Sequence, residues 1–183
     1  MSVLSDRDIL AAIQAEQIIV TPFDREAIGP NSLDVHLAPL LRIYADYETP
    51  LDCRKPRATI DLKIPEEGHV LKPNELYLGS TVEYTESRAH VPIINGCSSL
   101  GRLGLNIHAT AGTGDLGFKG CWTLELSVIR PLRVYPGQRI GQILWLTASS
   151  PPLKSYNERV GSKYVGETAT GPQASLEYLR HQK

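Results

Sequence analysis

The spacing of hydrophobic side chains predicts one helix at the start of the chain, followed by short strands. Ser5 and Asp8 form a helix-capping pattern, and Leu4 and Ile9 are spaced as a hydrophobic staple across it. Apolar positions then recur at helical spacing until about Gln17. Beyond the helix, apolar and polar residues alternate in short runs that are typical of strands with one buried face. The predicted strands are residues 17–20, 32–37, 40–44, 59–62, 76–84, 105–109, 121–129, 133–134 and 140–148.

Frequent turn signals between these strands favour a mainly β fold. The 183 residues include 15 Gly and 13 Pro, more breaks than a helical bundle would tolerate. Many short strands at close spacing indicate a compact β-barrel or sandwich. From residue 149 the sequence becomes polar and rich in Gly, Ser and Thr. We therefore expect a β domain over residues 1–155 and a flexible C-terminal arm over residues 156–183.

Composition and charge exclude several classes of protein. The chain is 42% hydrophobic and 21% charged, which is a globular composition, and its net charge of -1 argues against general binding to nucleic acid or membrane surfaces. It has neither an apolar run of about 18 residues nor a secretory signal at its start. Cys53, Cys97 and Cys121 are too widely spaced for a metal pair or a disulfide framework. We therefore expect a cytoplasmic protein with free thiols.

Three familiar nucleotide and metal motifs fail on context or are absent. Residues 112–117 match G-x-G-x-x-G, but a strand pattern follows where a dinucleotide fold needs a helix. The sequence contains no P-loop motif. The zinc deaminase signature, H-x-E with P-C-x-x-C, is also absent. We therefore expect no zinc centre of that type.

Candidate chemistry is concentrated in residues 96–125. Ser98, Ser99 and Arg102 lie in a Gly-flanked segment whose hydroxyls and guanidinium can hold phosphate oxygens. Asp115 sits in a turn between glycines, and Glu125 lies on a predicted strand, where partial burial can tune a carboxylate for proton transfer. Taken alone, each acid has a simpler explanation, because Asp often forms turns and strand Glu usually faces solvent.

The combination resembles the dCTP deaminase family, which shares its trimeric β fold with the dUTPases. The likeness runs from near residue 4 to near residue 172. It is carried, in chain order, by LSDRDI (4–9), NSLDVHL (31–37), GCSSLGRLGL (96–105), HATA (108–111), DLGFKG (115–120), TLE (123–125), PGQRIGQ (136–142) and KY (163–164). The resemblance implies a dUTPase-like compact β-barrel or jelly roll with an N-terminal helix, assembled as a homotrimer.

The resemblance also implies roles for individual residues. Glu125 would activate the water that attacks C4 of cytosine and then protonate the leaving ammonia. Ser98 and Arg102 would hold that water and the charge of the site, and Ala111 would place backbone against the base. Further substrate-binding positions are implied at Ser99, Asp115, Thr123, Tyr156, Lys163 and Gly171.

The expected ligands and partners follow from the same resemblance. The substrate would be a deoxycytidine nucleotide, with Mg²⁺ bound through its phosphates and no zinc. The sites would lie between subunits of the trimer, the arm would close over the nucleotide, and dTTP is a candidate feedback inhibitor. Because the net charge is only -1, no nucleic acid and no membrane is expected as a partner.

The sequence departs from the family pattern at positions that bear on the product. Cys97 replaces a usual Lys or Arg, and Glu167 replaces a Gln of the arm motif, so the number of phosphates recognised stays open. Residues 113–114, Thr-Gly, replace a bulky residue followed by Ile. We expect this change to remove a wall that would exclude water near the phosphates.

The favoured hypothesis is therefore deamination of dCTP to dUTP and ammonia. One alternative is a bifunctional enzyme that continues to dUMP and diphosphate, with Asp115 as general base for a second water. Another is a deaminase acting on a less phosphorylated deoxycytidine nucleotide. A non-enzymatic nucleotide sensor is disfavoured, because a pure binder needs no proton shuttle such as Glu125.

Overall fold

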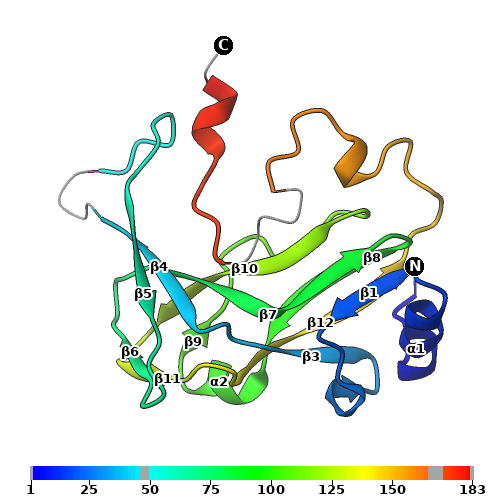
Figure 1. Cartoon of the computed structure of the whole chain (residues 1–183), viewed down its shortest axis with the longest axis horizontal. Coiled ribbons are helices and arrows are strands. Elements are labelled where there is room, and N and C mark those ends of the chain that lie inside the picture. Colours follow the sequence, from blue (N-terminus) through cyan, green and yellow to red (C-terminus); the bar gives the residue numbers. More distant parts are fainter. Residues whose placement is uncertain (1, 46–49, 165–170, 182–183) are drawn as a thin grey trace.

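The fold is shown by a computed structural model that describes residues 2–45, 50–164 and 171–181 (Figure 1). The helices are α1 (Asp6–Gln14) and the single turn α2 (Ser98–Arg102), and short 3₁₀ turns occur at Arg25–Ala27, Tyr156–Glu158 and Glu177–His181. The strands are β1 (Ile18–Thr21), β2 (Ile28–Gly29), β3 (Ser32–His36), β4 (Leu40–Tyr44), β5 (Thr59–Lys63), β6 (His69–Leu71), β7 (Tyr77–Ser87), β8 (His90–Gly96), β9 (Leu105–Asn106), β10 (Lys119–Val128), β11 (Leu132–Val134) and β12 (Arg139–Thr147). The predicted mainly β class is confirmed.

The strands form antiparallel sheets that enclose one core. The largest has the order β5-β4-β7-β10-β9, with β1 also paired to β7, and a four-stranded sheet has the order β2-β3-β12-β8. A two-stranded ribbon of β6 and β11 completes the set. Trp145 of β12 is fully buried, and its indole Nε1–H donates to the Ser87 hydroxyl of β7 at 2.9 Å, which links the two larger sheets.

Helix α1 is built as its sequence predicts. The Ser5 hydroxyl accepts from the backbone N–H of Asp8, and the Asp8 carboxylate accepts in return from Ser5, so the capping box is complete. Ile9 and Ala12 bury the inner face. The helix ends at Gln14, three residues before the expected end, because Glu16 adopts a left-handed φ of 54° that cannot continue it.

Alternation predicted the long strands well and the short or irregular elements poorly. On β10, Trp122, Leu124, Leu126 and Val128 are buried, while the residues between them are half-buried. The expected strand at 105–109 is regular only over β9, since the chain then bends toward Glu125. Strand β8 and ribbon strand β6 were not predicted, and residues 98–102 form the helix α2 rather than a turn.

The described part of the arm lies above the sheet that contains β10 (Figure 1). The backbone N–H of Tyr156 donates to the carbonyl of Leu116 at 2.8 Å, and that of Gln173 donates to the Thr123 hydroxyl at 3.0 Å. These bonds position two segments of the arm against the domain. Within the described ranges, no helix is long and apolar enough to cross a membrane.

Candidate active site

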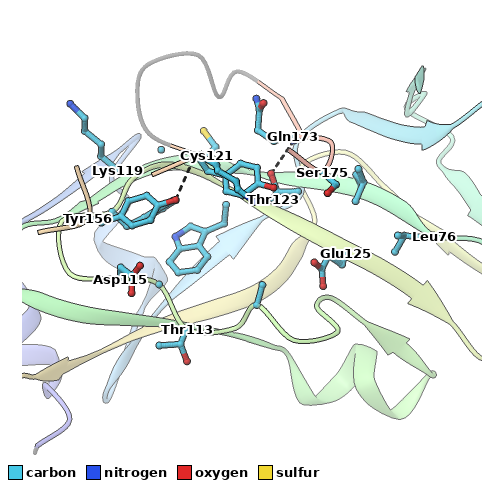
Figure 2. Close-up of a pocket in the computed structure, with 18 of the residues that line it drawn as sticks. Leu76, Thr113, Asp115, Lys119, Cys121, Thr123, Glu125, Tyr156, Gln173 and Ser175 are labelled. Atoms are coloured by element: carbon cyan, nitrogen blue, oxygen red, sulfur yellow. Dashed lines mark hydrogen bonds between the residues drawn. The ribbon is translucent and has the colours of Figure 1, made fainter. Parts of the chain in front are cut away.

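A pocket of about 550 Å³ lies between strand β10 and the described residues of the arm (Figure 2). Six of the ten site residues expected from the sequence line it: Ala111, Asp115, Thr123, Glu125, Tyr156 and Lys163. They come from the loop before β10, from β10 itself and from the arm. In Figure 2, Asp115 and Tyr156 lie at one end, and Glu125 lies toward Leu76 at the other.

Glu125 reaches the pocket because of its place on β10. The strand buries every second side chain, so Thr123 and Glu125 share the face that looks into the pocket. Oε2 of Glu125 accepts a hydrogen bond of 2.7 Å from the backbone N–H of Ala109. The backbone N–H of Glu125 in turn donates to the carbonyl of Ile107 at 2.8 Å. These two bonds join Glu125 to residues 107–109 and hold its Oε2, while no hydrogen bond described for this side chain uses Oε1.

Asp115 projects from a turn that depends on glycine. The backbone N–H of Phe118 donates to the carbonyl of Asp115 at 3.0 Å, which closes the turn. Gly117 has a left-handed φ of +91°, and a Cβ there would lie 2.7 Å from Ser155. Glycine therefore allows the start of the arm to pack on the turn. The exposed Asp115 side chain also lines a second, smaller pocket of about 340 Å³ with Lys154 and Arg159.

The wall expected to be missing beside residues 113–114 is present, so that part of the sequence interpretation is wrong. A Cβ at Gly114 would lie 2.6 Å from the ring of Trp122 and 2.9 Å from Pro92. The Trp122 indole thus occupies the space next to the small residue, and it packs on Phe118 with ring centroids 4.8 Å apart. Both rings line the pocket. The argument for a deaminase that stops at dUTP therefore loses its physical basis.

Two buried hydroxyls of β7 hold Trp122, one through its indole and one through its backbone. Its Nε1–H donates to Thr85 at 3.1 Å, and its backbone N–H donates to Thr81 at 2.9 Å. Both threonines are fully buried. This network fixes the orientation of the ring that forms the wall.

Lys163 lies in the pocket wall with only 12% of its side chain exposed. Its ammonium forms an ion pair with the carboxylate of Glu177. Lys163, expected as a substrate-binding residue, is therefore at the pocket and already has an anionic partner. Glu167, the acidic departure in the arm motif, lies outside the described residues.

Three expected residues do not reach this pocket in the single chain. Ser98, Ser99 and Arg102 are exposed on α2, and none of them is among the described residues that line the cavity. Exposed Leu103 and Ile129 lie beside the helix, at 53% and 76% exposure. Gly171 is also outside the lining and packs against Leu40, where a Cβ would lie 3.2 Å from a methyl group.

Several pocket residues were not expected from the sequence. They are mainly aromatic, cationic or amide side chains: Tyr44, Lys119, Trp122, Tyr164 and Gln173. Trp122 lies on the buried face of β10, next to a register shift between Cys121 and Thr123, and its ring also lines the pocket. Tyr44 and Gln173 are far apart in sequence and come to the same pocket only through the fold, so no local sequence pattern could identify them.

Cys121 is a half-buried thiol of the pocket wall. Burial raises its pKa above the usual value, and the nearby Glu83 carboxylate raises it further. Cys121 is therefore a neutral thiol at physiological pH. Within the described ranges, no group of three or more His, Cys, Asp or Glu side chains is arranged to hold a metal ion.

Comparisons with known proteins agree with the resemblance seen in the sequence. A family model described as dCTP deaminase-like matches residues 3–147. The chain is 42% identical over 181 residues to a Leptospira biflexa protein named dCTP deaminase, dUMP-forming, and the match covers 99% of each chain. It is 44% identical over 166 residues to a protein of the same name from Cytophaga hutchinsonii, covering 91% of each.

One solved structure supports the fold. The crystal structure of 2'-deoxycytidine 5'-triphosphate deaminase from Agrobacterium tumefaciens matches with a TM-score of 0.59 at 22% sequence identity. The match covers 80% of the present chain and 48% of the other, so this chain spans about half the length of that protein. At this identity the likeness shows the fold alone.

Proposed function

The chain belongs to the dCTP deaminase-like family, and on that basis we propose that it is a bifunctional hydrolase that converts dCTP to dUMP, ammonia and diphosphate. The observation that carries the proposal is that Glu125 and Asp115 line one pocket, toward opposite ends (Figure 2). Glu125 would act on the cytosine base, and Asp115 would act at the phosphates. This replaces the initial preference for dUTP as the product.

The first step is hydrolytic deamination at the Glu125 end. Glu125 takes a proton from a water through Oε1 as the water oxygen bonds to C4 of cytosine. The same group then delivers a proton to the amino nitrogen, the C4–N bond breaks, and ammonia leaves. The Ala109 N–H bond to Oε2 supports this role, because it orients the carboxylate for proton transfer.

The second step is cleavage of the triphosphate at the Asp115 end. Asp115 takes a proton from a second water as its oxygen bonds to the α-phosphorus. The bond from that phosphorus to the bridging oxygen breaks, and diphosphate leaves with dUMP as the other product. The aromatic wall of Trp122 and Phe118 supports this step, because it lines the same pocket as Asp115 and limits the space there in which water can lie.

The names of the relatives support the two-step product over dUTP. The Leptospira protein is described as dUMP-forming and matches along almost the whole chain. The retained wall beside Gly114 removes the physical objection to the second step. A deoxycytidine nucleotide is thus the proposed substrate, with the triphosphate as the preferred form.

Mg²⁺ is proposed to enter with the nucleotide. The exposed Asp115 carboxylate is compatible with a Mg²⁺ ion held mainly by the phosphates, and in that arrangement it stays free to act as the general base. Bound in this way, Mg²⁺ would offset the negative charge of the phosphates. Water activation for deamination is assigned to Glu125 without zinc.

We also propose that the working site forms between subunits of a homotrimer. Ser98, Ser99 and Arg102 carry the side chains expected at the water and phosphates, yet they are exposed on α2 away from the pocket. A second copy of the chain could bring its α2 to this pocket and cover the apolar Leu103 and Ile129. Closure of the arm over the nucleotide and inhibition by dTTP remain predictions.

The direct test is product identification. The purified protein is incubated with dCTP, dCMP or dUTP, each with Mg²⁺, and the products are separated by chromatography. The proposal expects dUMP and diphosphate from dCTP, little reaction of dCMP, and cleavage of supplied dUTP. Accumulation of dUTP as the end product would favour the single-step alternative.

A further inference from the structure

The end of the arm crosses the outer face of the largest sheet. We name residues 171–176 the C-terminal strap. The guanidinium Nη1 of Arg42 donates to the carbonyl of Pro172 at 2.9 Å, and the hydroxyl of Tyr44 accepts from the backbone N–H of Ser175 at 3.0 Å. On the other side of β7, the Thr123 hydroxyl accepts from the backbone N–H of Gln173 at 3.0 Å. The strap is therefore tied to β4 and β10 at three points.

Strand geometry explains why these ties converge on one face. Leu40, Arg42 and Tyr44 are alternate residues of β4, so their side chains share one side of the sheet. All three meet the strap, since a Cβ at Gly171 would contact Leu40 at 3.2 Å. The intervening Leu41 is fully buried in the core. The outward face of β4 is thus the support of the strap.

Arg42 is the anchor with the most specific geometry. Its Nε and Nη2 donate to the two carboxylate oxygens of Asp61 on β5, at 2.6 and 3.1 Å. This fork holds the guanidinium in one orientation and leaves Nη1 aimed at Pro172. Pro172 itself is buried. A lysine could supply the positive charge, but it could not form the two-point contact with Asp61 and the hydrogen bond to Pro172 at the same time.

The anchor lies in the same cross-strand row as Glu125. Arg42 and Glu125 both pair with Leu78 of β7, one from each side. Two strand spacings separate them, which is about 10 Å. Leu78, Glu125, Gln173 and Ser175 line the pocket, so the strap forms its wall at the Glu125 end (Figure 2).

We infer that Arg42 is a positioning residue for the nucleotide site, acting through Pro172 to hold the C-terminal strap as the pocket wall beside Glu125. The inference rests on the proposed function for its catalytic consequence. Arg42 does not touch the reacting atoms. Loss of the Arg42 side chain should release the strap and open the Glu125 end of the pocket to water. It should therefore weaken nucleotide binding more than it slows the chemical step.

The test compares Arg42→Ala and Arg42→Lys with Arg88→Ala as a matched control. Arg88 also bonds a carboxylate, that of Glu86, and a backbone carbonyl, that of Glu16, but its described contacts do not include the strap. Two readouts are taken on the full-length protein. One is hydrogen exchange of the strap amides without nucleotide, and the other is KM and kcat with dCTP and Mg²⁺.

Arg42→Ala should speed exchange at Gln173, Ser175 and Leu176 and raise KM about tenfold, the worth of one charge-assisted hydrogen bond, with a smaller change in kcat. Arg42→Lys should fall between Arg42→Ala and wild type, and Arg88→Ala should match wild type in both readouts. Tyr44→Phe, which loses only the Ser175 tie, should shift both readouts in the same direction by less.

Two results would overturn the inference. Unchanged strap exchange in Arg42→Ala and Tyr44→Phe would show that Arg42 does not hold the strap. Faster strap exchange with unchanged KM would show that the strap does not shape the nucleotide site. The exchange measurement needs no turnover, so a wild-type protein inactive on dCTP would refute the proposed function without altering the exchange result.

Discussion

The backbone N–H of Ala109 and the carboxylate of Glu125 form a hydrogen bond of 2.7 Å across the junction of β9 and β10. The bond joins an irregular segment to a regular strand at the floor of the pocket. A charged acceptor on a backbone donor is among the stronger hydrogen bonds in proteins. It orients the carboxylate that the proposed deamination needs.

Replacing Glu125 by Gln should separate the two proposed steps. The amide keeps the size of the side chain and can still accept from Ala109, but it cannot take a proton. Deamination of dCTP should fall about 10²- to 10⁴-fold, the usual contribution of a general acid–base group, while supplied dUTP is still cleaved. Steady-state assays with each nucleotide check this, with Glu86→Gln on β7 as a control. Near wild-type deamination by Glu125→Gln would remove Glu125 from its assigned role.

Replacing Asp115 by Asn should give the opposite phenotype. Asp115 lines the pocket at the end away from Glu125, so its loss should spare C4 chemistry (Figure 2). We expect dCTP to be deaminated and dUTP to accumulate, with cleavage reduced about 10²-fold or more. Time courses resolved by chromatography measure both products. If the variant still forms dUMP at the wild-type rate, Asp115 is a structural turn residue only.

The distribution of site residues predicts activity from mixed subunits. Ser98 and Arg102 lie on exposed α2, whereas Glu125 lies in the pocket. Arg102→Ala and Glu125→Gln should each be strongly impaired in deamination of dCTP when assayed alone. When they are unfolded and refolded together, some sites in mixed trimers should combine a wild-type Arg102 with a wild-type Glu125 and regain activity.

The control is each variant refolded alone, and light scattering should give about three times the chain mass of 20.2 kDa. A fully active monomer, or an absence of recovery in mixtures that form trimers, would contradict a shared site.

The raised pKa of the Cys121 thiol predicts that its alkylation is slow, depends on pH and becomes slower when nucleotide is bound. Burial raises the pKa of this thiol, so at pH 8 it holds less of the reactive thiolate than an ordinary cysteine. Its alkylation by iodoacetamide should therefore rise at higher pH than that of a small model thiol, and bound nucleotide should slow it, since Cys121 lines the pocket. Peptide mass spectrometry follows Cys121, with exposed Cys53 as the internal comparison. Equal protection of Cys53 by nucleotide would indicate a global effect instead.

The close contact at Gly114 predicts a cost for even one added methyl group. A Cβ there would lie 2.6 Å from Trp122, whereas one at Gly96 would lie 3.6 Å from Ile107 in ordinary contact. Gly114→Ala should lower the free energy of unfolding by about 1–3 kcal/mol, as overpacking does, and displace the indole from the pocket wall. Gly96→Ala is the control, and both are measured by denaturant unfolding with tryptophan fluorescence. Equal stability of the two variants would mean that the wall tolerates a larger residue at 114.

Local sequence patterns predicted the elements that depend on interactions between residues close together in the chain. The Ser5–Asp8 capping box and the alternation of β10 needed only neighbouring residues, and both were read correctly. Strand β8, with a proline in its middle, carries no clean alternation, and its partners on β12 lie about 50 residues away, so its sequence alone did not reveal it. The helical turn at Ser98–Arg102 was hidden by its glycine.

The site was predictable as a set of residue types but not as an arrangement. Glu125, Asp115 and Tyr156 were identified from motifs, and the fold brings them to one pocket. The wall beside Gly114 could not be foreseen, because it depends on how the loop that contains Gly114 packs against the Trp122 ring of β10. Arg42 was missed because its contact with Pro172 spans 130 residues.

The central claim, two hydrolyses in one pocket, is tested most directly by the isotopic content of the product made in heavy-oxygen water. Wild-type protein is given dCTP and Mg²⁺ in that solvent, and the nucleotide product is analysed by mass spectrometry. Our account predicts dUMP carrying two heavy oxygens, one at C4 of the base from the Glu125 step and one on the phosphate from the Asp115 step. An end product of dUTP carrying a single heavy oxygen on the base would contradict it.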